Sequence, residues 1–338
     1  MITLNTPAPT AHAGILGLGT FRPERIVTND EICLRIDSND EWIRERSGII
    51  ERRHGGPDET VVTMATAAAR KAIADAGISA EQLDLVMVAT VTHRYQTPSA
   101  AVEVAAAIGA VNAAATDTSA ACAGFCYGLG IADGMIRSGA AKYILLIGAE
   151  KLSEIVNFDD RGTAFLFADG AGAVVIGPAE EPGIGPAIWG SDADSRDAIL
   201  LNPAWTDFKK APTKGVTDLG WPYINQQGQT VFRWAVYSMS KVGLQALEAA
   251  GITGDQLAAF IPHQANFRII ETMAKEMKLP ASVVIADDIK TNGNTSSASI
   301  PLAMDALLES HPELSGGLTL IIGYGAGLVY AGQVVQLP

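Results

Sequence analysis

The chain has only three cysteines in 338 residues: Cys33, Cys122 and Cys126. Three thiols cannot all pair, and no two of them have the CxxC spacing of zinc and redox motifs. The sequence therefore argues against a disulfide framework and predicts no metal site. A cysteine in such a chain is free to act as a chemical group.

Basic residues are also scarce, since 24 Lys and Arg stand against 37 Asp and Glu, for a net charge of −13. This charge repels nucleic-acid phosphates and anionic membrane surfaces, so we expect neither as a partner. No apolar run approaches the length of a membrane span, and residues 1–13 lack the basic and apolar regions of a secretory signal. We therefore expect a cytoplasmic protein whose residues 1–13 form a flexible tail.

The sequence does contain an internal repeat. The segment AIADAGISAEQL at 72–83 recurs as ALEAAGITGDQL at 246–257, an offset of 174 with six of twelve positions identical. The strand-like YILLIG at 143–148 recurs as LTLIIG at 318–323, an offset of 175. Each copy predicts a helix, then a glycine break and then an apolar strand. This order is typical of α/β proteins whose parallel strands are buried on both faces. We predict two equivalent α/β halves, 14–178 and 188–338, with the functional site between them.

Two segments have no clear copy in the other half. The stretch between Trp189 and Trp234 loses its periodicity and is rich in turn formers and aromatics, which indicates a surface excursion. The sequence HRYQTP at 93–98 interrupts the first half between a predicted strand and helix. Insertions in a duplicated fold usually shape the functional site.

Cys122 lies in TDTSAACAGFCYGLG, where a predicted strand ends and a Gly-rich helix begins. A helix N-terminus has free N–H groups and a partial positive charge, which favour a thiolate and can hold an oxyanion. This context predicts a nucleophile; the alternative is a small buried hydrophobe, which most free cysteines are. Cys126, one helical turn further on, and Cys33 are expected to be structural.

His263 follows the apolar strand LAAFIP, and the carboxyl ends of strands are where α/β sheets bind ligands. The repeat sets Ala89 opposite it, so the fold itself does not need a histidine there; a hydrogen-bonded structural histidine remains the alternative. Asn294 precedes a helix that the repeat sets against the helix of Cys122, although it also suits a turn or helix cap. The loop-like surroundings of three other histidines predict surface positions: His54, His93 and His311.

Taken together, SAACAGF around Cys122, PHQAN around His263, GNTSSASIP around Asn294 and the terminal GYGAGL resemble β-ketoacyl-acyl-carrier-protein synthase III. DEWIRERSGI, DRGTAFLFADGAGAVV and QTVFRWAV extend the resemblance over almost the whole chain. It implies a thiolase-like, duplicated five-layer αβαβα sandwich that works as a homodimer. It also implies that Cys122 takes an acyl group from acyl-CoA and condenses it with malonyl-acyl carrier protein, initiating fatty-acid biosynthesis. Acyl-CoA is then a substrate, and no cofactor is expected.

The resemblance also assigns roles within the site. The backbone amides of Cys122 and Ala326 would hold the oxyanion, while His263 and Asn294 would donate to the malonyl thioester oxygen. Coenzyme A would be bound by Trp42, Arg46, Arg161, Gly228, Phe232, Ala265 and Asn266, with Trp42 and Arg161 around its adenine. The acidic carrier protein would dock on Arg233, Arg268 and Lys275. Without the family, Trp42 is interpreted as core, Arg161 as part of a surface ion pair, and Arg268 and Lys275 as a solvated helix face.

Thr97 stands where some family members have a bulky Phe that crosses the dimer interface and floors the acyl pocket. We therefore expect a roomier pocket that admits branched or longer primers. Three alternatives keep the fold: a starter-unit synthase of a polyketide pathway, an acyltransferase that esterifies a hydroxyl, and a non-catalytic partner subunit. Asn294 argues against the second, and the presence of all three catalytic candidates argues against the third.

Overall fold

The computed structural model describes residues 8–210 and 220–338, and its two five-stranded sheets have the same strand order. The first sheet runs β1-β7-β6-β4-β5 and the second runs β8-β14-β13-β11-β12. Their bounds are β1 His12–Phe21, β4 Leu85–Ala89, β5 Ala114–Thr118, β6 Ile144–Lys151, β7 Asp169–Ala179, β8 Ile188–Ser191, β11 Ala259–Pro262, β12 Val284–Ile285, β13 Leu318–Gly325 and β14 Val329–Gln336. The predicted duplication is confirmed strand by strand.

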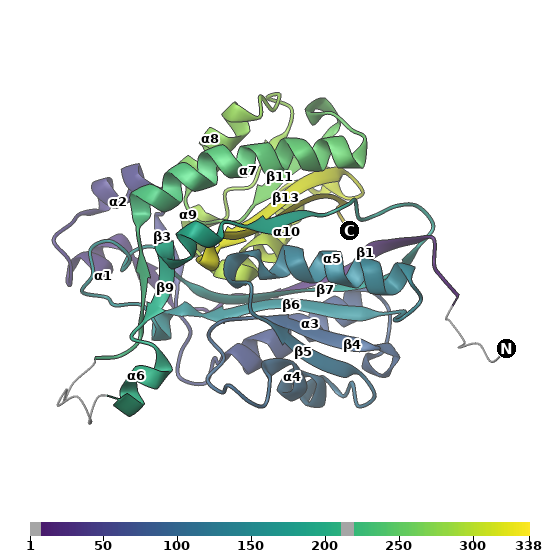
Figure 1. Ribbon diagram of the computed structural model, residues 1–338, viewed down its shortest axis with the longest axis horizontal. Coiled ribbons are helices and arrows are strands. Elements are labelled where there is room, and N and C mark those ends of the chain that lie inside the picture. Colours follow the sequence, from purple (N-terminus) through teal and green to yellow (C-terminus); the bar gives the residue numbers. More distant parts are fainter. Residues whose placement is uncertain (1–7, 211–219) are drawn as a thin grey trace.

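Helices form three layers that alternate with the two sheets (Figure 1). Helices α3 (Val61–Asp75) and α4 (Ala100–Ile108) cover the outer face of the first sheet, and α5 (Gly124–Arg137) and α10 (Ser299–Ser310) lie between the sheets. Helices α7 (Gly228–Ala250) and α8 (Phe267–Glu276) cover the second sheet. Strands β4 and β6 are buried at every position because helices pack on both of their faces. The five-layer sandwich is therefore confirmed.

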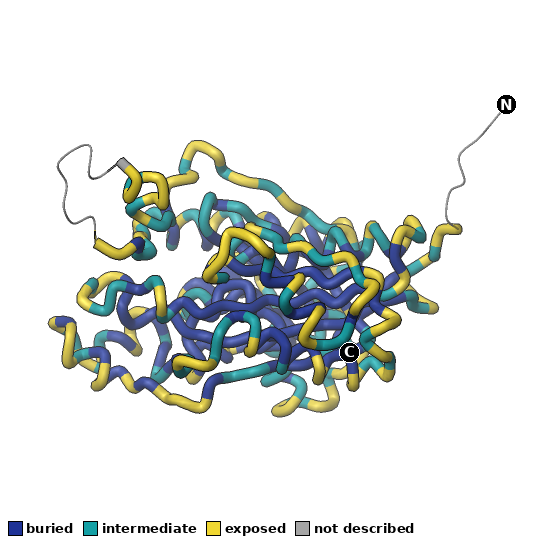
Figure 2. The backbone as a smooth tube through the Cα atoms, turned by 90° about the horizontal axis from the view of Figure 1, so that it is seen from below, coloured by how far each residue is buried: buried dark blue, intermediate teal, exposed yellow. Residues whose placement is uncertain are grey.

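The hydrophobic core follows this layering. Separate clusters of buried side chains fill the space between the first sheet and its outer helices, the space between the sheets, and the space beneath α7 and α8. Figure 2 shows the buried segments running through the middle of the molecule. No helix within residues 8–210 and 220–338 is long and apolar enough to cross a membrane.

Shorter elements surround the second half and the edge of the first. They are the pair β2 (Ile26–Thr28) and β3 (Glu51–Arg53), helices α1 (Asn29–Cys33), α2 (Asp40–Ser47) and α9 (Ile289–Asn292), and, within the excursion, β9 (Ile199–Asn202), α6 (Trp205–Lys210) and β10 (Tyr223–Gln226). Strands β9 and β10 pair as an antiparallel ribbon. Their apolar residues line the cavity described below, so the excursion is part of the site wall.

Two sequence-based expectations need correction. Strand β1 begins at His12, inside the segment 1–13 assigned to the tail, because His12 pairs through its backbone with Ala179 of β7; residues 1–7 lie outside the described part. Two of the histidines expected at the surface have buried side chains: His54 is only 4% exposed, and the side chain of His93 is only 5% exposed. The His54 ring packs near Phe158, and its Nε2 is 3.3 Å from the carbonyl oxygen of Phe167.

Candidate active site

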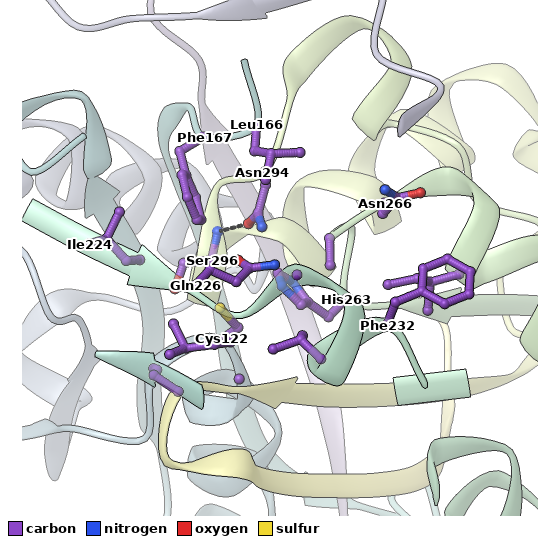
Figure 3. Close-up of a pocket in the computed structure, with 18 of the residues that line it drawn as sticks. Cys122, Leu166, Phe167, Ile224, Gln226, Phe232, His263, Asn266, Asn294 and Ser296 are labelled. Carbon is purple, nitrogen blue, oxygen red and sulfur yellow. Dashed lines mark hydrogen bonds between the residues drawn. The ribbon is translucent and has the colours of Figure 1, made fainter. Parts of the chain in front are cut away.

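A cavity of about 790 Å³ lies between the two halves, with the β9–β10 ribbon contributing one wall. The first half contributes Cys122, and the second contributes His263 and Asn294. Figure 3 shows the three side chains directed toward one space, with Ser296 beside the sulfur. The residues that the sequence identified as chemical candidates therefore converge.

Cys122 occupies a single 3-10 turn, η2 (Ala121–Ala123), which leads directly into α5. The backbone of β13 passes close above it at Gly325. A Cβ atom at Gly325 would lie only 2.8 Å from the Cys122 nitrogen and 3.1 Å from Sγ. Glycine is needed there because any side chain would displace the nucleophile.

Cys122 rests as a thiol. Burial, together with the charge of Glu150, raises its pKa to about 12, against the neighbouring Ser296 hydroxyl, which favours the thiolate. The accessible surface that the residue retains faces the cavity. In the resting site, the loss of water around the sulfur therefore outweighs the groups that favour a thiolate.

His263 directly follows β11, and its ring is held by α10. Nδ1 lies 2.7 Å from Ser299 Oγ, and the Gln264 N–H donates to the same oxygen over 3.3 Å. The Ser299 hydroxyl proton is then directed to Nδ1, a tautomer assigned from this network. Burial lowers the pKa of His263 to about 3, so the ring is neutral and carries its N–H on Nε2. His263 can therefore offer a donor to a ligand.

Asn294 lies between α9 and the turn η7 (Ser296–Ala298). Its Oδ1 accepts from the Ser296 N–H over 2.8 Å, which leaves the amide NH₂ as a donor. Its backbone is fixed to the first half, where its N–H donates to the Leu166 carbonyl oxygen and its own carbonyl accepts from Ala168. The site thus holds two positioned neutral donors, from His263 and Asn294.

Six of the seven residues predicted to bind coenzyme A line the cavity: Trp42, Arg46, Gly228, Phe232, Ala265 and Asn266. The seventh, Arg161, stacks on the Trp42 ring with its guanidinium carbon 4.6 Å from the centroid. For a purine to fit between the guanidinium and the indole ring, these two planes must lie roughly 7 Å apart. At the observed separation, Arg161 therefore occupies the space that an inserted base would need. Asn266 caps α8 by accepting from the Arg268 N–H, and its amide donates to the Arg46 carbonyl oxygen.

Comparisons with known proteins agree with one another. The model of the 3-oxoacyl-[acyl-carrier-protein (ACP)] synthase III family matches residues 116–193, and the model of its C-terminal part matches residues 247–337. A β-ketoacyl-[acyl-carrier-protein] synthase III 1 from Streptomyces coelicolor is 53% identical over 332 residues, 97% of each chain. A β-ketoacyl-[acyl-carrier-protein] synthase III from Streptomyces glaucescens is 54% identical over 327 residues, again 97% of each. The chain therefore belongs to the 3-oxoacyl-[acyl-carrier-protein] synthase III family.

Solved structures agree with this assignment. The priming β-ketosynthase of the R1128 polyketide pathway superposes with a TM-score of 0.95 at 43% identity, covering 99% of this chain and 98% of the other. The 3-oxoacyl-[acyl-carrier-protein] synthase III of Aquifex aeolicus gives 0.88 at 37% identity, covering 96% and 99%. The fold is thiolase-like, and the chain is a condensing enzyme of the acyltransferase type, as its motifs predict.

The predicted docking residues of this synthase are all exposed. Arg233 of α7 and Arg268 of α8 stand at the cavity mouth, whereas Lys275 lies further along α8, outside the lining. Thr97 is exposed on the loop that follows β4 and does not line the cavity of the single chain. Its expected place in the acyl pocket thus depends on a second subunit.

Sequence reasoning missed two buried residues of the site. Glu150, at the end of β6, is fully buried, and burial raises its pKa to about 7. Tyr324 packs edge-on against His263, with ring centroids 5.2 Å apart, and within the described residues its hydroxyl has no hydrogen-bond partner. The signal for Glu150 was present, because a carboxylate follows the apolar run ILLIGA within one buried strand.

Proposed function

We propose that this chain initiates fatty-acid synthesis. Cys122 takes a short or branched acyl group from acyl-CoA, and the acyl-enzyme then condenses with malonyl-acyl carrier protein as carbon dioxide leaves. The observation that carries this proposal is the convergence of Cys122, His263 and Asn294 in one cavity that opens through a mouth lined with arginine and aromatic residues.

In the first half-reaction the sulfur attacks the thioester carbonyl. The backbone amides of Cys122 and Ala326 would stabilise the tetrahedral oxyanion, and the close passage of Gly325 over Cys122 supports this placement. Coenzyme A then departs and leaves the acyl group on sulfur.

In the second half-reaction, loss of carbon dioxide turns the malonyl group into an enolate, which attacks the acyl carbon. The Nε2–H of His263 and the amide of Asn294 would donate to the enolate oxygen. A neutral imidazole suits this role because it stabilises the developing charge without giving up a full proton. The chemistry proceeds on side chains and backbone amides, so the proposal includes no metal or redox cofactor.

Both substrates would approach through the same mouth. Adenine of coenzyme A would displace Arg161 from Trp42 and take its place on the indole face. The acidic carrier protein would then dock on Arg233, Arg268 and Lys275, a local basic patch on a chain whose net charge is −13. Both substrates belong to the cytoplasm, where we place the enzyme.

A homodimer is part of the proposal. Strand β5 is an edge strand of the first sheet, and apolar residues are exposed beside it and on the neighbouring loop, including Val102, Val111 and Tyr95. Pairing two copies through this edge would cover the unpaired strand and those side chains. It would also bring the loop of Thr97 toward the partner's site.

A second candidate is supported by one comparison. The priming ketosynthase of the R1128 polyketide pathway has the same fold at 43% identity and covers nearly the whole chain. This chain could prime a type II polyketide pathway by the same chemistry with a different carrier protein. Presenting acyl-enzyme with malonyl carried on fatty-acid and on polyketide carrier proteins separates the two, since the preferred carrier condenses faster.

Intact-mass measurement after incubation with a panel of acyl-CoAs tests the proposal. We expect a mass increase equal to one acyl group, absent from Cys122→Ala because that variant lacks the accepting sulfur. Cys126→Ala is the matched control, since Cys126 is buried one helical turn away and should leave the shift intact. Equal adducts on wild type and Cys122→Ala would rule out the acyl-cysteine mechanism.

A further inference from the structure

We propose that Glu150 is the proton acceptor for Cys122, and that the Ser296 hydroxyl passes the proton between them. The inference rests on the proposed role of Cys122 as the nucleophile and explains how a buried thiol becomes a thiolate. Three groups lie in a row: the Cys122 sulfur, Ser296 beside it in the cavity lining, and Glu150, whose Oε1 is 3.1 Å from Ser296 Oγ.

The two oxygens of Glu150 have different surroundings. Oε2 accepts three hydrogen bonds: from the Val91 N–H over 3.1 Å, from Thr92 Oγ1 over 2.5 Å and from Thr90 Oγ1 over 3.2 Å. The Thr92 hydroxyl also accepts from the Lys151 N–H, so its own proton is directed to the carboxylate. These three donors therefore stabilise negative charge on Oε2.

Oε1 is the oxygen with room for a proton. It faces Ser296 Oγ and, at 3.3 Å, Ser297 Oγ. The Ser297 hydroxyl donates to the Ala89 carbonyl oxygen over 2.7 Å, and a carbonyl can only accept. The proton of Ser297 is thus directed elsewhere, which leaves Ser296 as the group that connects Oε1 to the sulfur.

The transfer balances as follows. The S–H bond of Cys122 breaks and its proton binds Ser296 Oγ, while the original Ser296 proton moves to Glu150 Oε1. Sulfur becomes a thiolate that accepts a hydrogen bond from Ser296, and Glu150 becomes a neutral acid that donates to Ser296. After sulfur has attacked the thioester, the departing thiolate of CoA takes the proton back from Glu150 through Ser296.

The energetic cost of adding a second buried charge is the physical reason for such an acceptor. Glu150 and Ser296 are buried, and within the described residues no ion pair involves Glu150, since the neighbouring Lys151 binds the Gly56 carbonyl oxygen and Glu154 instead. His263 is neutral and supplies no positive charge. If the Cys122 thiol lost its proton to water, the thiolate would add a second negative charge beside the Glu150 carboxylate. Transfer of the proton to Glu150 instead moves the existing negative charge from the carboxylate to the sulfur.

The duplication explains how these residues came to lie together. At the offset of 175, Ser297 matches Cys122, Ser296 matches Ala121 and Glu150 matches Gly325. Ala121 and Ser296 share an unusual positive φ of 45° and 51°. Ser296 and Ser297 therefore lie in the second-half copy of the catalytic turn, where Ser297 stands at the position of the nucleophile, and Glu150 reaches them from β6 of the first half.

Two variants test the relay. Glu150→Gln keeps the size of the side chain but cannot take a proton, and Ser296→Ala removes the connecting hydroxyl at a backbone conformation that alanine already adopts at Ala121. We expect either variant to slow single-turnover acylation by acyl-CoA about 100-fold. The double variant should be no slower than either single variant, because both break one path.

The pH profile separates a relay from a purely electrostatic effect. Iodoacetamide alkylation of wild-type Cys122 should show an inflection near pH 7, where Glu150 titrates, and Glu150→Gln should lack it and react more slowly at neutral pH. If Glu150 only contributed charge, its removal would lower the thiol pKa and speed both reactions. Acylation of Glu150→Gln at or above the wild-type rate would therefore overturn the relay.

Thr90→Val is the matched control, because it removes a donor to Oε2 and leaves the path through Oε1 intact. It should keep the inflection, and thermal unfolding shows whether each variant is folded. Loss of the inflection in Thr90→Val alone, with Ser296→Ala behaving as wild type, would also refute the path. If no acyl-CoA acylates the wild type, the proposed function fails while alkylation still tests the relay.

Discussion

Single buried residues make the protein sensitive to acid. Burial, together with the positive charges of Arg52 and Arg25, lowers the pKa of His54 to about 4, against a hydrogen bond with the Phe167 carbonyl that raises it. Between pH 6.5 and 4 the unfolded chain therefore binds a proton that the folded chain does not. Stability contributed by neutral His54 is present above this window and is lost as the pH falls through it.

His54→Gln keeps a donor for the Phe167 carbonyl oxygen and removes the titration. We expect the wild type to lose about 2 kcal/mol more than the variant in its free energy of unfolding between pH 7 and pH 5. Urea denaturation at the two pH values measures the difference. Equal losses would mean that His54 is protonated in the folded protein as easily as in the unfolded chain.

The residues of the site differ in how far sequence could reveal them. Cys122, His263 and Asn294 each lie in a motif at the junction of a strand or turn with a helix, which a linear pattern can show. The role of Glu150 depends on partners 60 and 146 positions away, Thr90 and Ser296, and no local pattern records that contact. Its protonation state likewise depends on burial, which only the folded chain determines.

At the scale of elements, the halves interlock through their central strands. Gly148 of β6 lies against the turn η7 of the second half, and Gly323 of β13 lies against η2 of the first. A Cβ atom at Gly148 would overlap the Ser297 carbonyl oxygen, and one at Gly323 would lie 3.0 Å from the Ala123 Cα. The repeat identified these two glycines as equivalent positions in the sequence. It did not predict that each of them contacts the other half.

Gly148→Ala should therefore destabilise the protein by about 3 kcal/mol, because the added methyl group meets rigid backbone. Gly134→Ala is the control: it lies exposed within α5 with no atom near its added Cβ, and should stabilise by about 0.5–1 kcal/mol through helix propensity. Urea denaturation of both variants tests the packing. A neutral Gly148→Ala would show that η7 can move away from β6 without loss.

At the scale of the whole molecule, the repeat predicted two α/β halves because apolar patterning determines which faces of each strand are buried. The ribbon of β9 and β10 was not predicted, since it has no copy to compare and its strands span only four residues each. Ile199, Leu201 and Ile224 from this ribbon form part of the cavity lining. The duplicated scaffold thus positions Cys122, His263 and Asn294, while an unduplicated insertion forms part of the cavity wall.

In the proposed dimer, the range of accepted primers would depend on both subunits rather than on one chain. Thr97 is exposed on the loop after β4, beside the edge that we propose as the dimer interface. In a dimer its small side chain would leave room in the partner's acyl pocket, and Thr97→Phe would fill that room. We expect the wild type to load branched and longer acyl groups and Thr97→Phe to load chiefly acetyl, as measured by intact mass over an acyl-CoA panel.

Thr97→Val is the matched control, because valine has nearly the shape of threonine and should preserve the wild-type range. Sedimentation must show the same assembly for all three proteins, so that a changed range reflects the pocket rather than dissociation. A Thr97→Phe protein that loads long primers as readily as the wild type would show that the loop does not reach the pocket. A wild type that accepts only acetyl would refute the roomier pocket itself, since the small residue at 97 would then have no effect on primer choice.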